Sequence, residues 1–264
     1  MTTPATNNAF APTLDLFRAD AYLRECSATV VALQPDGGIV LDRTVFYPLG
    51  GGQAGDSGTL VRADGSAIAI ADTRKSKDAD GAPTAAIVHV PADPAGAPLS
   101  VGEAVTARID WDRRHRLMRF HTTTHLLCHL VAQPVNGCSI TPDAARLDFH
   151  MDGALDKDAL TAGIAQLVAA GHAVTLGEIS DAELDAQPDL VKSMSVQPPR
   201  GSGTVRTVKV GGNGASDGAG QPHIDLQPCG GTHVANTREI GAVVVTKIEK
   251  KGAMARRVVL GLAA

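Results

Sequence analysis

Short alternating runs of apolar and polar residues fill the first third of the chain. Gly, Asp and Pro clusters such as Pro35-Asp36-Gly37-Gly38 separate these runs, which occupy residues 29–33, 38–41, 67–71, 86–90 and 104–109. A period of two, broken by turn-forming residues, is typical of short antiparallel strands. The pattern therefore predicts a small antiparallel β-barrel or sandwich over residues 1–109.

The hydrophobic period changes near Asp110. Residues 117–131 contain neither Gly nor Pro, which predicts a helix. A second helix is expected between Asp152, which can cap its start, and Gly171, which can end it. Residues 205–210, 242–248 and 256–262 are strand-like in composition. We therefore expect a mixed α/β domain over residues 110–264 and an α+β protein overall.

Composition supports two domains of ordinary size. The chain has 264 residues, of which 44% are hydrophobic but only 3% aromatic, so aliphatic side chains must fill the cores. Four cysteines are too few for a disulfide scaffold. Residues 1–12 contain no Lys or Arg, and no apolar run is long enough to cross a bilayer, so a cytoplasmic protein without membrane contact is expected.

Charge is distributed unevenly along the chain. The net charge of −4 argues against a nucleic-acid-binding surface, but residues 141–190 alone contain ten acidic and two basic residues. The rest of the chain is therefore net basic. Its bases concentrate in two clusters, which are either solvated faces or phosphate-binding surfaces: Arg108, Arg113, Arg114, Arg116 and Arg119, and Lys247, Lys250, Lys251, Arg256 and Arg257.

Two pairs of metal-ligand residues share the same spacing. His121 and His125 lie four residues apart on the predicted helix, and Cys229 and His233 repeat that spacing around two glycines. Either pair alone is a weak signal. Together they form a Cys-His₃ set that suits one zinc ion per chain. A structural zinc remains an alternative, but ligands from distant segments and the nearby hydroxyls of Thr122–Thr124 and Thr232 favour hydrolytic catalysis.

A second unusual stretch has five glycines between residues 50 and 58 and includes Gln53. It lacks the Lys-Ser/Thr of a phosphate-binding loop and the spacing of a dinucleotide site. Two interpretations remain open. The stretch is either a turn between strands, or a segment whose bare backbone passes close to a ligand while Gln53 supplies a neutral hydrogen-bonding group.

Four segments together resemble the AlaX family, the freestanding relatives of the alanyl-tRNA synthetase editing domain, in its medium-length type. These segments are residues 47–53, 121–127, 229–234 and 239–257, and the resemblance extends over roughly residues 41–262. It implies a translation-factor-like β-barrel over residues 1–109. It also implies a zinc-containing editing domain, shared with alanyl- and threonyl-tRNA synthetases, over residues 110–264. The loop at 211–220 looks longer than is usual in the family.

The resemblance implies a hydrolase that removes serine, and in some members glycine, from mischarged alanine tRNA. It assigns the zinc to His121, His125, Cys229 and His233, places Gly51, Gly52 and Gln53 beside the catalytic pocket, and has Thr124 read the serine hydroxyl. The tRNA phosphates would be bound by Arg113, Arg114, Arg116, Lys250, Lys251 and Arg256, and a monomer is favoured. A threonyl-type editing hydrolase and a tRNA-binding module with a structural zinc are the alternatives.

Overall fold

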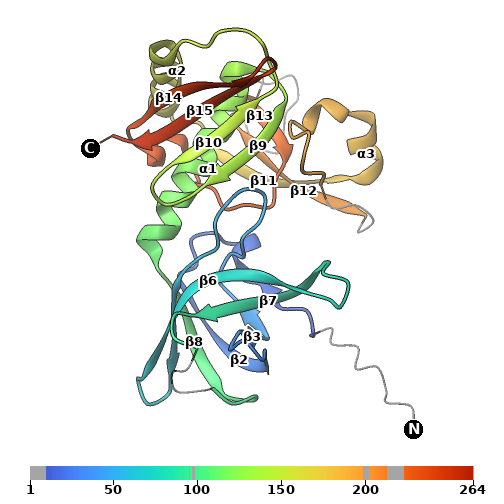
Figure 1. Cartoon of the computed structure of the whole chain (residues 1–264), viewed down its shortest axis with the longest axis vertical. Coiled ribbons are helices and arrows are strands. Elements are labelled where there is room, and N and C mark those ends of the chain that lie inside the picture. The colour runs from blue at the N-terminus through green and yellow to red at the C-terminus, as the bar shows by residue number, and fades with distance from the viewer. Residues whose placement is uncertain (1–9, 95, 97–98, 199–202, 213–222, 264) are drawn as a thin grey trace. The chain divides into compact units, whose positions relative to one another are not determined.

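The computed structural model describes residues 10–94, 96, 99–198, 203–212 and 223–263 (Figure 1). Most of the predicted loop at 211–220 lies outside these residues. The chain divides into two compact units, one formed by Met1–Gly50 and Gly55–Arg114, the other by Gly51–Ala54 and His115–Ala264. The short segment Gly51–Ala54 therefore belongs with the C-terminal part of the chain.

The first unit is a closed antiparallel barrel with strand order β2-β3-β7-β6-β5-β8 (Figure 1). This outcome confirms the predicted antiparallel barrel. A short parallel pair, β1 and β4, and a 3₁₀ turn, Leu16–Arg18, lie outside the barrel order. The strands are β1 (Leu14–Asp15), β2 (Glu25–Leu33), β3 (Ile39–Leu41), β4 (Arg43–Thr44), β5 (Gly58–Arg62), β6 (Ala67–Lys77), β7 (Pro83–Pro91) and β8 (Ala104–Ile109).

Aliphatic side chains fill the barrel, as the low aromatic content requires. Inward-facing residues of β2, β3, β5 and β8, among them Val30, Leu41, Leu60 and Val105, join one buried cluster with Phe46. Closure of the sheet satisfies the backbone groups that an open sheet would leave at its edges. The barrel is therefore held by strand pairing and aliphatic burial.

Arg114 is a buried structural residue of the first unit, which corrects its prediction as a phosphate ligand. The Arg114 and Asp56 side chains are both 0% exposed. The guanidinium donates to both Asp56 carboxylate oxygens and to the carbonyls of Ala21 and Val45. A group enclosed in this way cannot reach a tRNA phosphate, because its donors are already used inside the protein.

The second unit contains two antiparallel sheets. One has strand order β14-β15-β10-β9 and the other β11-β12-β13. Helix α2 packs on β14. The elements are α1 (Trp111–Val131), which begins in the first unit, β9 (Val135–Ile140), β10 (Ala145–Phe149), α2 (Lys157–Ala170), β11 (Val174–Ser180), α3 (Asp181–Ala186), β12 (Thr204–Val210), β13 (Asp225–Pro228), β14 (Val243–Gly252) and β15 (Ala255–Leu262), with 3₁₀ turns Pro188–Leu190 and Thr237–Ile240.

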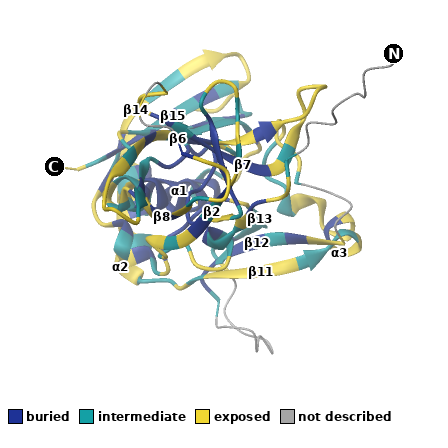
Figure 2. Cartoon of the chain, turned by 90° about the horizontal axis from the view of Figure 1, so that it is seen from below, coloured by how far each residue is buried: buried dark blue, intermediate teal, exposed yellow. Residues whose placement is uncertain are grey.

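Both predicted helices are present, but each starts at a different residue from the one predicted. Helix α1 begins at Trp111, six residues before the predicted start. Asp156, not Asp152, caps α2, because its carboxylate accepts from the backbone N–H groups of Asp158 and Ala159. Gly171 ends α2 in the left-handed conformation, as predicted. Most of α1 is buried (Figure 2). Within the described residues, no helix is both long enough and apolar enough to span a bilayer.

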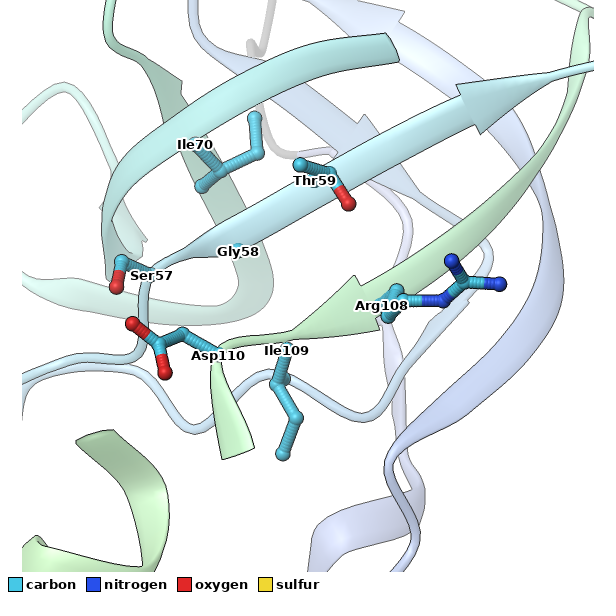
Figure 3. Close-up of a pocket in the computed structure, with 7 residues that line it drawn as sticks. All are labelled: Ser57, Gly58, Thr59, Ile70, Arg108, Ile109 and Asp110. Atoms are coloured by element: carbon cyan, nitrogen blue, oxygen red, sulfur yellow. The ribbon is translucent and has the colours of Figure 1, made fainter. Parts of the chain in front are cut away.

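The first unit also has a surface hollow of about 310 Å³ (Figure 3). The charged residues of its lining already have partners, since Arg108 pairs with Glu25 and Asp110 accepts from the backbone N–H of Arg113. The rest of the lining is Ser57, Gly58, Thr59, Ile70 and Ile109. The hollow therefore brings together no set of metal ligands.

Arg114→Gln should destabilise the barrel strongly, because it leaves the buried Asp56 carboxylate without its charged partner. We expect a loss of about 3–5 kcal/mol in the free energy of unfolding, measured by urea denaturation. The matched control is Arg108→Gln, whose ion pair with Glu25 is more than half exposed and should contribute less than about 1 kcal/mol. Equal losses in the two variants would contradict this assignment.

Candidate metal centre

Helix α1 presents His121 and His125 one turn apart on the same face. Their ring centroids lie 5.5 Å apart, and both residues are buried. The threonines between them are buried as well, and the Thr124 hydroxyl donates to the His121 carbonyl at 2.7 Å. Helix α1 therefore places two buried imidazoles on one face, with buried threonines between them in sequence.

The loop after β13 brings Cys229 and His233 to these imidazoles. The Cys229 Sγ lies 3.5 Å from His121 Nε2 and 3.3 Å from His233 Nε2. The possible ligand atoms of all four residues lie within 4.8 Å of one another. The structure thus brings together the whole ligand set that the spacing predicted.

Gly231 makes this approach of the loop possible. A Cβ atom at Gly231 would lie 2.1 Å from His121 Cε1, which no side chain tolerates. Arg206 on β12 holds the same loop from its backbone side, because its guanidinium donates to the carbonyls of Cys229 and Gly231. The conformation of the loop is therefore fixed on both sides.

Each imidazole has an oxygen partner at Nδ1. His121 donates to Gln53 Oε1 at 2.7 Å, and His125 donates to Asp225 Oδ2 at 2.8 Å. The hydroxyl of Thr122 lies 3.2 Å from Nδ1 of His233. Because amide and carboxylate oxygens only accept, Nδ1 of His121 and of His125 carries a proton, so Nε2 is the nitrogen through which each ring can bind a metal.

The charges of the cluster also suit a metal. Burial raises the pKa of the Cys229 thiol, but His121 and His233 outweigh it and hold that pKa well below its ordinary value. Burial lowers the pKa of His233 to about 3, so this ring is neutral. Burial lowers the pKa of His125, but Asp225 and Cys229 raise it to about 10, so a metal must displace a proton there.

Three imidazoles and one thiolate are the donor set of a tetrahedral zinc site. The fixed Nδ1 partners show that the residues are oriented for such an ion as well as near one another. The three histidines are buried, and Cys229 as a residue is partly buried.

The glycine-rich segment lies against this centre. Gln53 is 0% exposed; its Oε1 accepts from the backbone N–H of Thr232, and its Nε2 donates to Thr232 Oγ1. Gly51 and Gly52 have positive φ angles, and a Cβ at Gly52 would lie 2.8 Å from the Cys138 carbonyl oxygen. The glycines therefore let the segment pair with β9, and Gln53 acts as a positioning residue for His121.

The residues predicted to bind tRNA phosphates differ in exposure. Lys250 and Lys251 are exposed at the end of β14, and Arg116 is exposed on α1. Arg113 is partly buried and donates to the Gly55 carbonyl. Arg256 is 9% exposed and donates to the carbonyls of the β14–β15 turn and of Asp152. Arg256 therefore stabilises the hairpin, which corrects its prediction as a phosphate ligand.

Sequence reasoning placed the Thr122 hydroxyl near the site but missed Asp225 and Arg206 as supporting residues of the centre. These two lie on β13 and β12 and reach the site through tertiary packing. Asp225 lies four residues before Cys229, on the strand that leads into the loop with the thiolate, and this closeness in sequence is the one signal that could have found it.

Comparison with known proteins defines the class of protein. Residues 205–259, which include Cys229 and His233, match the family described as threonyl and alanyl tRNA synthetase second additional domain. Residues 9–113 match the family described as tRNA synthetases class II (A). The chain is thus a relative of class II synthetases that carries their editing-type domain.

Full-length relatives identify the family. The chain is 32% identical to the alanyl-tRNA editing protein AlaX-M of Saccharolobus solfataricus, over 93% of this chain and 97% of that protein. It is 33% identical to AlaX-M of Methanosarcina acetivorans, over 92% and 96%. An alanine–tRNA ligase of Ignicoccus hospitalis is 31% identical over 91% of this chain, but over only 25% of the ligase. The chain belongs to the AlaX family, which confirms the resemblance found in its sequence motifs.

Gly231→Ala should abolish zinc binding, because the added methyl group occupies the position of the His121 ring. We expect loss of the bound ion, measured as zinc content after dialysis. Gly252→Ala is the matched control, since a Cβ there meets no atom within 4 Å. Normal zinc content in Gly231→Ala would show that the loop does not carry a ligand in this conformation.

Proposed function

We propose that this protein is a trans-editing hydrolase that deacylates mischarged alanine tRNA, with serine and in some cases glycine as the amino acid removed. The observation that carries the proposal is the buried centre of three oriented imidazoles and one thiolate, in a member of the AlaX family. The proposal includes tRNA as the macromolecular substrate and the cytoplasm as the location. It also includes a translation-factor-like type for the closed barrel.

His121, His125, Cys229 and His233 would hold the zinc. When bound, zinc supplies a Lewis acid that can polarise an ester carbonyl or lower the pKa of water. The chain's own residues provide the rest of the site. Gln53 and Asp225 keep two imidazoles in the required tautomer, and the buried threonines exclude bulk water from the helix side.

Thr124 would recognise the serine side chain. Its hydroxyl proton is used in the hydrogen bond to the His121 carbonyl, so its oxygen is left to accept. A serine hydroxyl would therefore donate to Thr124. A buried acceptor that loses its partner is unfavourable, which gives such a site selectivity for the hydroxyl-bearing amino acid.

A structural zinc in a tRNA-binding module is the second candidate, because four protein ligands complete a tetrahedral site. The two candidates differ in turnover. A structural site would leave the ester intact, whereas a catalytic site must have one ligand that yields or a coordination sphere that expands. The similarity to proteins named as alanyl-tRNA editing proteins favours the catalytic alternative.

His121→Ala should reduce release of serine from Ser-charged alanine tRNA by at least about 100-fold, because it removes a ligand of the centre. The measurement is the rate of amino-acid release, with Gly-, Ala- and Ser-charged alanine tRNA and with Ser-charged threonine tRNA. A chelator should give the same loss in the wild type. Unchanged release after complete zinc removal would contradict the zinc role, and a preference for threonine tRNA would favour the threonyl-type alternative.

Lys250→Ala and Lys251→Ala should weaken tRNA binding and lower its salt dependence. Each lysine that contacts a phosphate should reduce the slope of log affinity against log salt by about 1. Lys157→Ala, an exposed lysine at the start of α2 in the acidic stretch, is the control and should leave the slope unchanged. Equal slopes in all three variants would show that these lysines do not contact tRNA.

A further inference from the structure

Asp225 is an acidic side chain that hydrogen-bonds a member of the metal cluster, His125. Its side chain is 3% exposed, and its Oδ2 accepts from His125 Nδ1 and from Gln227 Nε2, each at 2.8 Å. Gln227 lies two residues further along the same strand, β13. The carboxylate is thus held in place by its own strand and aimed at a ligand.

The charge of the cluster explains the choice of a carboxylate. A zinc ion carries two positive charges, of which the Cys229 thiolate cancels one, and the three neutral imidazoles cancel none. One positive charge would remain in a buried site, where an unbalanced charge is strongly unfavourable. A carboxylate that contacts one of the ligands brings the net charge of the buried centre to zero.

The neighbouring ionisable groups do not supply this charge. Burial raises the pKa of the Cys138 thiol to about 12 and raises that of the Cys128 thiol as well, so both thiols are neutral. Arg206 is a cation, but it donates to the carbonyls of the loop and lies opposite Glu178 in the β11–β12 register. Asp225 is therefore the group that balances the centre.

His121 has the neutral counterpart of this arrangement. Gln53 accepts from Nδ1 of His121, just as Asp225 accepts from Nδ1 of His125. The two hydrogen bonds are 2.7 and 2.8 Å long. The amide orients its ring but adds no charge. The two histidines on α1 thus have matched geometry and differ in the charge of the acceptor.

We propose that Asp225 is a positioning residue that sets the net charge of the zinc centre through His125, while Gln53 supplies orientation alone. This inference rests on the proposed function only in taking zinc as the ion. It assigns a role to a residue outside the ligand set. It also predicts that a carboxylate beside His121 can replace the carboxylate beside His125.

Zinc affinity of the full-length protein, measured by competition with a chromophoric chelator, tests the proposal. Asp225→Asn keeps an oxygen acceptor for His125 but removes the charge, and should weaken zinc binding by about 10–100-fold. Gln53→Glu adds a charge beside His121 with little change in shape, since the Thr232 hydroxyl can rotate to donate to the new carboxylate. This variant should bind zinc at least as tightly as the wild type, and the double variant should recover most of the affinity lost in Asp225→Asn.

Two results would overturn the proposal. One is unchanged zinc affinity in Asp225→Asn, and the other is a double variant that binds as weakly as Asp225→Asn, because the role of Asp225 would then be geometric. Asp143→Asn, whose side chain is 92% exposed, is the matched control and should leave zinc affinity unchanged. If Asp225→Asn does not fold, as judged by circular dichroism, weaker binding by Gln53→Glu than by the wild type overturns the charge argument.

His121→Ala separates this inference from the proposed function. If that variant still binds zinc with wild-type affinity, the metal centre itself is wrong. If it loses zinc while Asp225→Asn retains it, the centre stands and only the charge role of Asp225 fails.

Discussion

The centre depends on the hydrogen bonds at Nδ1 of its buried histidines. A neutral imidazole can carry its proton on either nitrogen, and a buried N–H without an acceptor costs about 1–3 kcal/mol. The acceptors Gln53 and Asp225 remove this freedom for His121 and His125, so both Nε2 atoms are available to one ion. The partners come from the glycine-rich segment and from β13, which ties these segments to α1.

The requirement for these acceptors explains features that are unrelated in sequence. Gly51 and Gly52 adopt positive φ angles so that Gln53 can enter a fully buried position. Gly231 lacks a side chain because the ring of His121 occupies the space where a Cβ would lie. Glycines far apart in the chain thus have the same purpose, which is to let backbone approach an oriented imidazole.

The sequence predicted residues whose signal is periodic or local. The alternating strands of the barrel, the long helix α1 and the stop at Gly171 follow from such patterns, and so do the four ligands, since each pair has helical or turn spacing. Gln53 was found because its glycines are unusual. The start of α2 was misplaced because two aspartates compete for one cap, and only packing decides between them.

The features that sequence reasoning missed depend on hydrogen bonds between residues that lie far apart in the sequence. Arg114 and Arg256 looked like members of basic clusters, because a sequence shows a charge but not its partner. The partner of Arg114 is Asp56, 58 residues away, and that of Arg256 is a set of backbone carbonyls. Asp225 lies 100 residues from His125, and no rule of spacing connects an acceptor with a histidine at that distance. Lys250 is exposed on β14, so its assignment to a tRNA phosphate stays a prediction.

The hydrogen bond of Thr124 limits what the site can select. The Thr124 hydroxyl proton is used in the hydrogen bond to the His121 carbonyl. Under the proposed function, Thr124 therefore stabilises only an amino acid whose side chain donates a hydrogen bond to the Thr124 oxygen. Serine does so, whereas alanine and glycine both leave the acceptor unpaired. Thr124 therefore favours serine over alanine and over glycine for the same reason. Any release of glycine must depend on its small size, and discrimination of glycine from alanine must come from steric contacts elsewhere in the pocket.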